Sequence, residues 1–97
     1  MTPEKQRITI AEACGWQYVN FNYILQGVWQ NVGSFPDYLN DLNACHEMEK
    51  LLVDAFERRK YYQTLDEITG DQWATIVATA AQRCEAFLKT VNLWKPQ

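Results

Sequence analysis

The sequence predicts an α+β fold, a three-layer α/β/α sandwich with one antiparallel sheet in the middle. Two stretches show features of paired strands, and three others space their apolar residues as helices do. The chain is 97 residues long, so residues 1–97 should form a single domain. The expected order is α-β-β-α-β-β-α, because helices with one apolar stripe each must lie on a sheet face.

The first helix is expected over residues 3–14. The hydroxyl of Thr2 can cap free backbone amides, and Pro3 suits the first helical position because it has no amide hydrogen. Gly15 is a natural place for the helix to stop.

A hairpin is expected next, beginning at residue 17. Val19, Phe21 and Tyr23 alternate with asparagines, which puts large side chains on one face and amides on the other. Residues 28–32 would form the second strand, paired through a turn near residues 26–27.

A long second helix is expected over about residues 41–58, after capping candidates that include Asp41. Its apolar residues recur at helical spacing and form one stripe. These residues are Leu42, Cys45, Met48, Leu52, Ala55 and Phe56.

A second hairpin and a third helix complete the predicted fold. Residues 60–68 are rich in Tyr and Thr, which favours a strand, residues 69–71 are typical of a turn, and residues 73–77 would be the partner strand. The last helix should begin after Thr79, with Gln82 completing a capping box. Its buried stripe would consist of Ala81, Cys84, Leu88 and Val91.

The charge and the uncharged stretches exclude several classes of protein. A formal net charge of −3 disfavours binding to duplex nucleic acid, which depends on positive charge. Residues 13–36 carry no charge but contain six Asn and Gln side chains, so we expect no membrane span. The charged N-terminus resembles no signal peptide, and three widely separated cysteines are typical of reduced thiols, so we expect a cytoplasmic protein.

Three blocks of sequence carry a family resemblance. They are IAEACGW at residues 10–16, PDYLNDLNA with the following HEMEKL at residues 36–51, and ATAAQRCEAFL at residues 78–88. Together they resemble small phage and prophage proteins with the phage ABA sandwich domain. The resemblance implies a three-layer α/β/α sandwich and a phage protein acting inside an infected bacterial host cell. That family has no uniform activity, so the resemblance implies no catalytic residue.

Two groups of polar residues are candidates for a catalytic or metal site. His46 follows Cys45, but a zinc site would also need Cys14 or Cys84 from another helix, and each cysteine fits core packing better. Carboxylates crowd the start of the second helix and could hold a cation, although helix capping explains them more simply. They are Asp37, Asp41, Glu47 and Glu49. The sequence therefore predicts no metal, no cofactor and no enzyme.

The clearest candidate for ligand binding is the one basic cluster. Guanidinium groups pair with phosphate and aromatic rings stack on bases, a combination that suits a nucleotide. The alternative is a helix C-terminus carrying favourable positive charge, followed by strand tyrosines. The candidate ligand-binding residues are Arg58, Arg59, Lys60, Tyr61 and Tyr62, with Trp29 as a further ring.

Aromatic residues are concentrated in the first 40 positions, and the whole chain has thirteen aromatic rings. A domain of this size has little interior for them, so some should form a subunit interface or a stacking platform. We therefore expect a homo-oligomer.

Two functions remain as expectations. The first is a non-enzymatic, phage-encoded anti-defence protein that sequesters a nucleotide-derived immune signal of the host. The alternative is a protein that inhibits a host defence enzyme through its acidic face, the carboxylates around Asp37 and Glu49.

Overall fold

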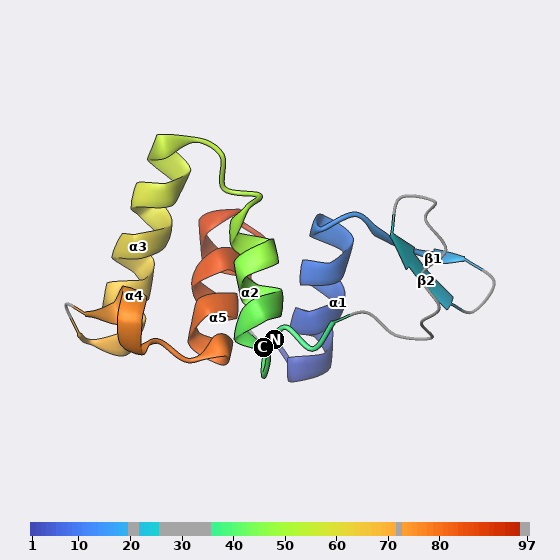
Figure 1. The fold of residues 1–97 in the computed structure, drawn as a ribbon, viewed down its shortest axis with the longest axis horizontal. Helices are drawn as coiled ribbons and strands as arrows, with labels where there is room; N and C mark the ends of the chain where they lie inside the picture. The colour runs from blue at the N-terminus through green and yellow to red at the C-terminus, as the bar shows by residue number, and fades with distance from the viewer. Residues whose placement is uncertain (20–21, 26–35, 72, 96–97) are drawn as a thin grey trace.

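The computed structural model describes residues 1–19, 22–25, 36–71 and 73–95, which form five helices and a two-stranded hairpin (Figure 1). In chain order these are α1 (Pro3–Ala13), β1 (Trp16–Val19), β2 (Asn22–Leu25), α2 (Leu42–Glu49), α3 (Ala55–Thr69), α4 (Ala74–Val77) and α5 (Ala80–Thr90).

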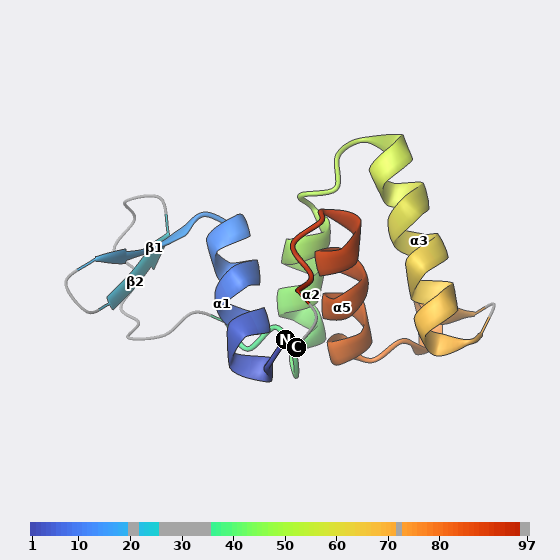
Figure 2. The same ribbon diagram turned by 180° about the vertical axis from the view of Figure 1, so that it is seen from behind.

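The helices lie in a row, with α5 packed against α1, α2 and α3. Figures 1 and 2 show α3 at one end of the row and the hairpin at the other, beyond α1, in a molecule 43 Å long. The two ends of the chain meet, because the amino group of Met1 donates a hydrogen bond of 3.1 Å to the carbonyl of Lys95. No helix in the described part of the chain is long and apolar enough to cross a membrane.

The predicted α/β/α sandwich is wrong, because residues 60–68 belong to helix α3 and residues 74–77 form helix α4. Within the described residues the only sheet is the β1–β2 pair. Tyr61, Leu65 and Ile68 follow one another at intervals of four and three, a helical stripe that packs toward the core. Burial of this stripe outweighs the strand preference of Tyr and Thr.

The predicted long helix over residues 41–58 is also wrong. Helix α2 ends at Glu49, and α3 begins after Asp54, whose carboxylate accepts a hydrogen bond of 2.8 Å from the amide of Phe56. This N-cap starts a new helix in a different direction. The predicted stripe is divided as a result, since Cys45, Met48 and Leu52 are buried while Leu42 and Phe56 are exposed.

The first hairpin differs from the prediction in its turn. β1 and β2 are antiparallel, with Trp16 opposite Leu25 and Val19 opposite Asn22, so both strands lie in the stretch expected to be one strand. The predicted turn near residues 26–27 and the predicted strand over residues 28–32 lie outside the described residues.

The predicted helix caps are confirmed. The hydroxyl of Thr2 accepts from the amide of Lys5 at the start of α1, and Thr79 and Gln82 form the expected capping box of α5. Gly70, which is expected in a hairpin turn, instead ends α3 with a φ of 67°, a left-handed conformation that glycine adopts without steric cost.

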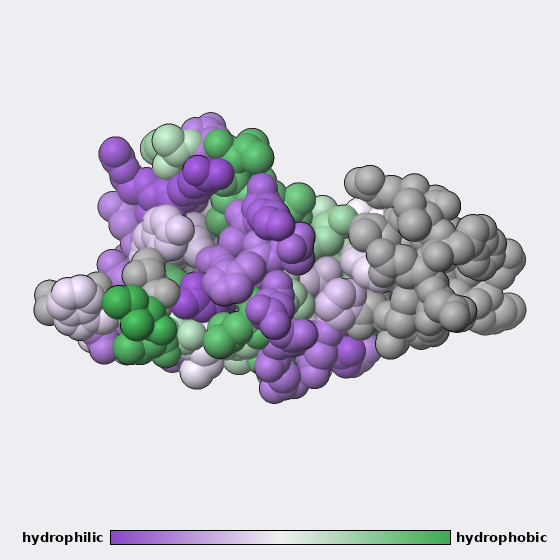
Figure 3. Space-filling view, in the orientation of Figure 1, coloured by the Kyte–Doolittle hydropathy of each residue, from purple (hydrophilic) through white to green (hydrophobic). Residues whose placement is uncertain are grey.

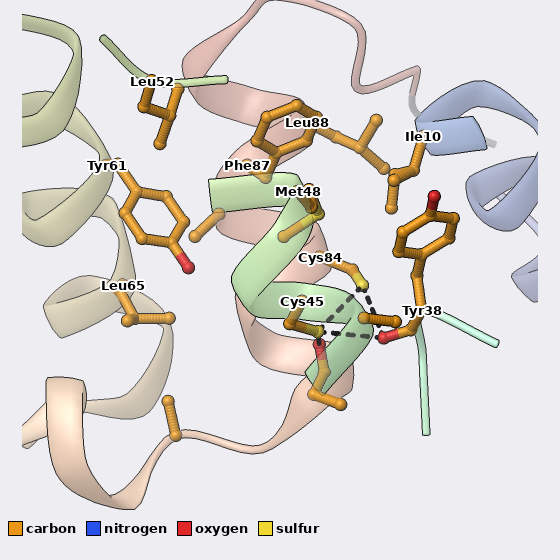
Figure 4. Packing of buried hydrophobic residues seen from close by; sticks show 14 of the residues in the cluster. Ile10, Tyr38, Cys45, Met48, Leu52, Tyr61, Leu65, Cys84, Phe87 and Leu88 are labelled. Carbon is orange, nitrogen blue, oxygen red and sulfur yellow. Dashed lines mark hydrogen bonds between the residues drawn. The ribbon is translucent and has the colours of Figure 1, made fainter. Parts of the chain in front are cut away.

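The core lies where α5 meets α1, α2 and α3 (Figure 4). Its largest fully buried side chains come from four helices and the segment that follows α2. They are Tyr61, Phe87, Ile10, Met48, Leu52, Leu65, Leu88, Cys45 and Cys84.

A pair of substitutions separates this fold from the predicted one. Leu65→Ala should lower the free energy of unfolding by about 2 to 5 kcal/mol, because it leaves a cavity between α3 and α5. Phe56→Ala should change it by no more than about 0.5 kcal/mol, because that ring is 74% exposed. Urea denaturation followed by circular dichroism measures both. Equal losses for the two variants would contradict the structure.

Candidate functional site

The predicted cationic residues lie on the first half of α3. Arg58, Arg59 and Lys60 are all exposed. Arg58 is partly engaged within the chain, because its Nε donates a hydrogen bond of 2.5 Å to the carbonyl of Leu52. Arg59 and Lys60 form no ion pair with any described residue.

The two predicted tyrosines have opposite environments. Tyr61 is buried in the core, so its ring cannot stack on a ligand, whereas Tyr62 is 45% exposed. Their ring centroids are 5.4 Å apart. Burial, together with a hydrogen bond to Glu49, raises the pKa of Tyr61 above its ordinary value. Trp29, the remaining predicted residue, lies outside the described residues.

The helical conformation regroups the predicted site. Residues three or four apart share a helix face, so Tyr62 is a neighbour of Arg58 and Arg59 on the surface of α3. Lys60 is turned away from Arg58, and Tyr61 points toward α5. The structure therefore keeps Arg58, Arg59 and Tyr62 together on one face of α3. It places Lys60 and Tyr61 on other sides of the helix.

A polar cluster that the sequence did not predict joins three helices at Glu49. The carboxylate of Glu49, at the end of α2, accepts a hydrogen bond of 2.7 Å from the hydroxyl of Tyr61 on α3. The same oxygen lies 3.3 Å from Nη1 of Arg83, a buried residue of α5. The other oxygen lies 3.1 Å from Nδ1 of His46.

The Glu49 cluster explains how the buried charge of Arg83 is tolerated. A buried guanidinium is costly unless it is paired and hydrogen-bonded, and Arg83 meets both conditions through Glu49 and the carbonyl of Ala78. No pattern in the sequence brings these residues together, because Glu49 and Arg83 are 34 positions apart and an arginine is ordinarily expected on the exposed side of a helix.

The chemistry available to this cluster is limited. Glu49 lies beside Nδ1 of His46, an arrangement that can orient a catalytic imidazole. The His46 side chain is largely exposed to solvent, however, and lies in no pocket that the structure describes. Two surface hollows are lined by residues of α1, α5 and the segments near them, and none of the cluster residues lines either. The described residues contain no group of three or more His, Cys, Asp or Glu that could hold a metal. The cluster therefore fits a role in helix packing.

The carboxylates near the start of α2 act as caps and local partners. Asp41 caps the helix by accepting from the amide of Asn43 at 2.9 Å. Asp37 accepts from the amide side chain of Asn40 at 3.0 Å and lies 3.5 Å from Nε of Arg7. Glu47 pairs with Lys50 at 2.9 Å. These contacts support the capping interpretation and leave fewer free charges for an acidic docking face.

Two of the three cysteines are core residues, as the sequence predicts. The thiols of Cys45 and Cys84 both donate to the carbonyl of Tyr38, at 3.0 and 3.1 Å, and their sulfur atoms are 3.9 Å apart (Figure 4). The contact between the two thiols, together with burial, raises the pKa of Cys84 above its ordinary value. Cys14 is half-buried, and burial raises the pKa of its thiol.

The structure also exposes large apolar side chains, including Phe56, which is predicted in the buried stripe, and Trp73, Ile76 and Val77, which are predicted in a strand. Five lie between residues 51 and 77, and each is 54% to 76% exposed. They are Val53, Phe56, Trp73, Ile76 and Val77. Figure 3 shows apolar atoms over α4 and near the connection from α2 to α3.

Comparisons with known proteins give no match, because no family model, no curated protein and no solved structure is detectably similar to this chain. The resemblance of the three sequence blocks to the phage ABA sandwich family therefore stays a prediction.

The packing role of Glu49 can be tested by one isosteric change. Glu49→Gln should lower the free energy of unfolding by about 1 to 3 kcal/mol, because it removes the negative charge that faces buried Arg83. Glu47→Gln is the matched control, since it breaks only an exposed pair with Lys50 and should cost less than about 1 kcal/mol. Urea unfolding measures both, and equal effects would contradict the proposed role.

Proposed function

We propose that this chain is a non-enzymatic interaction protein whose α3–α4 surface binds another polypeptide, namely a second copy of the chain. The α3–α4 surface consists of the exposed residues of α3 together with Trp73, Ile76 and Val77. The observation that carries the proposal is the exposure of large apolar side chains on this part of the molecule. Soluble monomers seldom leave large apolar patches uncovered.

The geometry of α4 strengthens the argument. The amides of Ile76 and Val77 both donate to the carbonyl of Trp73, at 2.8 and 3.0 Å, so these three residues form one helical turn. Residues at positions i, i+3 and i+4 are neighbours on a helix surface. A bulky apolar group on a short helix at the edge of the molecule is well placed to contact another protein.

A protein partner suits this surface better than a small ligand does. Small molecules bind mostly in concave pockets that cover most of their surface. The exposed residues of α3 instead lie along the outside of a helix at the end of the row (Figure 1). Two protein surfaces can match over such a convex face, with aromatic and Arg side chains as the main contacts.

Self-association gives the first test of this proposal. Sedimentation velocity should show the wild-type chain passing from an 11.4 kDa monomer to a larger species as its concentration rises into the micromolar range. The double substitution Ile76→Ser and Val77→Ser should shift the equilibrium toward monomer by tenfold or more, because it removes exposed apolar area. Its unfolding midpoint should change little.

The matched control for this experiment is Leu42→Ser, which removes a comparably exposed side chain on α2 and should leave association unchanged. A wild-type chain that stays monomeric at every concentration would overturn the proposal.

A second candidate is a phosphate-bearing ligand, and the exposed grouping of Arg58, Arg59 and Tyr62 favours it. Guanidinium groups would pair with phosphate while the Tyr62 ring stacks on a base. The further step, sequestration of a nucleotide-derived signal by a phage protein in an infected bacterium, depends on the family resemblance and stays a prediction.

Calorimetric titration with adenine nucleotides and cyclic dinucleotides tests this second candidate. Binding of a nucleotide to the wild type would support this candidate if the double variant Arg59→Ala, Tyr62→Ala binds it at least tenfold more weakly. Charged phosphate contacts and base stacking each contribute about 1 to 3 kcal/mol. Lys5→Ala on α1 is the control. Absence of heat with every nucleotide would contradict it.

A further inference from the structure

The outer face of α3 is a continuous row of six exposed residues. Their spacing of three and four positions places them on one side of the helix, opposite the buried Tyr61 and Leu65. The row, called here the α3 outer face, consists of Phe56, Arg59, Lys60, Gln63, Asp66 and Glu67. Helix α3 lies at the end of the row of helices, where α4 and α5 pack against it, and these six residues remain exposed (Figures 1 and 2).

The charges on the α3 outer face are arranged symmetrically about Gln63. Arg59 and Lys60 come four and three residues before it, and Asp66 and Glu67 come three and four residues after it. These four side chains form no ion pair with any residue in the described ranges. Half of the face is therefore basic and the other half acidic.

We propose that α3 pairs antiparallel with α3 of a second copy, around a two-fold axis that passes near Gln63. This inference rests on the self-association proposed above and names its geometry. In that pairing Arg59 faces Asp66 of the second copy, and Lys60 faces Glu67 of the second copy, because each pair lies on the same side of the α3 outer face. The two-fold axis repeats each pair, so the interface is self-complementary, as a symmetric dimer requires. A parallel pairing would place like charges opposite one another.

The ends of the α3 outer face fit the same register. Phe56 lies seven residues before Gln63, and Gly70 lies seven residues after it. Gly70 leaves open space, since no atom lies within 4 Å of the place where a β-carbon would be. The exposed ring of Phe56 would therefore rest over Gly70 of the second copy. The exposed Trp73 follows three residues later and extends the apolar contact onto α4.

The inferred dimer should be weak and reversible. A helix of 15 residues is only about 22 Å long, so the contact is at the small end of specific interfaces. Charged pairs at such a surface determine orientation more than affinity. The charge pattern therefore predicts which register forms, and the apolar ends supply most of the attraction.

Two opposite charge reversals test the register. Arg59→Glu alone puts negative charges opposite each other in a homodimer, and Asp66→Arg alone puts positive charges opposite each other. Each variant by itself should dimerise at least tenfold more weakly than the wild type. An equimolar mixture of the two should dimerise again, because the reversed residue of each variant then faces an opposite charge in the other. Labelling each variant with a different fluorophore allows energy transfer to report the mixed dimer.

The controls separate this register from a general effect of charge. Arg59→Glu makes the net charge more negative than −3 and Asp66→Arg makes it less negative, so a uniform electrostatic effect could not weaken both homodimers. Lys5→Glu and Glu12→Arg, both exposed on α1, make the same reversals away from the α3 outer face. Each of these should dimerise as the wild type does. Circular dichroism should show that all four variants remain folded.

The outcomes distinguish this inference from the proposed function. A wild-type chain that never dimerises overturns both proposals. A wild-type dimer that is weakened by the α4 substitutions, but not by either charge reversal, overturns only the α3 register. A mixture that dimerises no better than the separate variants overturns it too, and tighter association of Arg59→Glu would indicate parallel helices instead.

Discussion

Burial of α5 on several sides is the constraint from which the arrangement of the other helices follows. Seven of its eleven residues are buried, which is more than a single apolar stripe would supply. A helix buried to this extent must be covered from more than one direction, and α1, α2 and α3 each pack against it. The outer helices therefore bury one side against α5 and keep the other in solvent. That division makes the exposed side of α3 available for contacts outside the chain.

The wide buried surface of α5 also brings Arg83 into the interior, and the pairing of its charge determines how α3 is oriented. Glu49 lies between Arg83 and the Tyr61 hydroxyl, so α2, α3 and α5 meet at one carboxylate. A buried carboxylate and guanidinium are stable only with good geometry and further hydrogen bonds. Because Tyr61 must point toward Glu49, the opposite side of α3 is the side that carries Phe56, Gln63 and their neighbours.

Capping signals in the sequence predict where α1 and α5 begin, whereas contacts between distant residues escape it. Thr2 and Thr79 act through their own backbone neighbours, so their roles as caps follow from residue type. Gly70 is expected in the turn of a hairpin and instead ends helix α3. The sequence predicts a strand over residues 60–68 because Tyr and Thr favour strands. The helical spacing of Tyr61, Leu65 and Ile68 stabilises a helix because α5 covers that side. The Glu49 cluster could not be predicted, since its partners come from three helices. The predicted strand places Tyr61 in the ligand site, and the predicted long helix places Phe56 in the core, whereas Tyr61 is buried and Phe56 is exposed.

The α3 outer face has a charged centre and apolar ends, and these two parts have different physical effects. Exposed charge pairs gain little free energy in water, because solvent and salt screen them and side-chain entropy opposes them. They discriminate strongly between orientations, however, since like charges brought together repel. Phe56 and the α4 residues Trp73, Ile76 and Val77 provide the apolar area that favours association in any orientation. Affinity and register are thus determined by different residues, and a chain of this size can remain a folded monomer at low concentration while still pairing in one defined way.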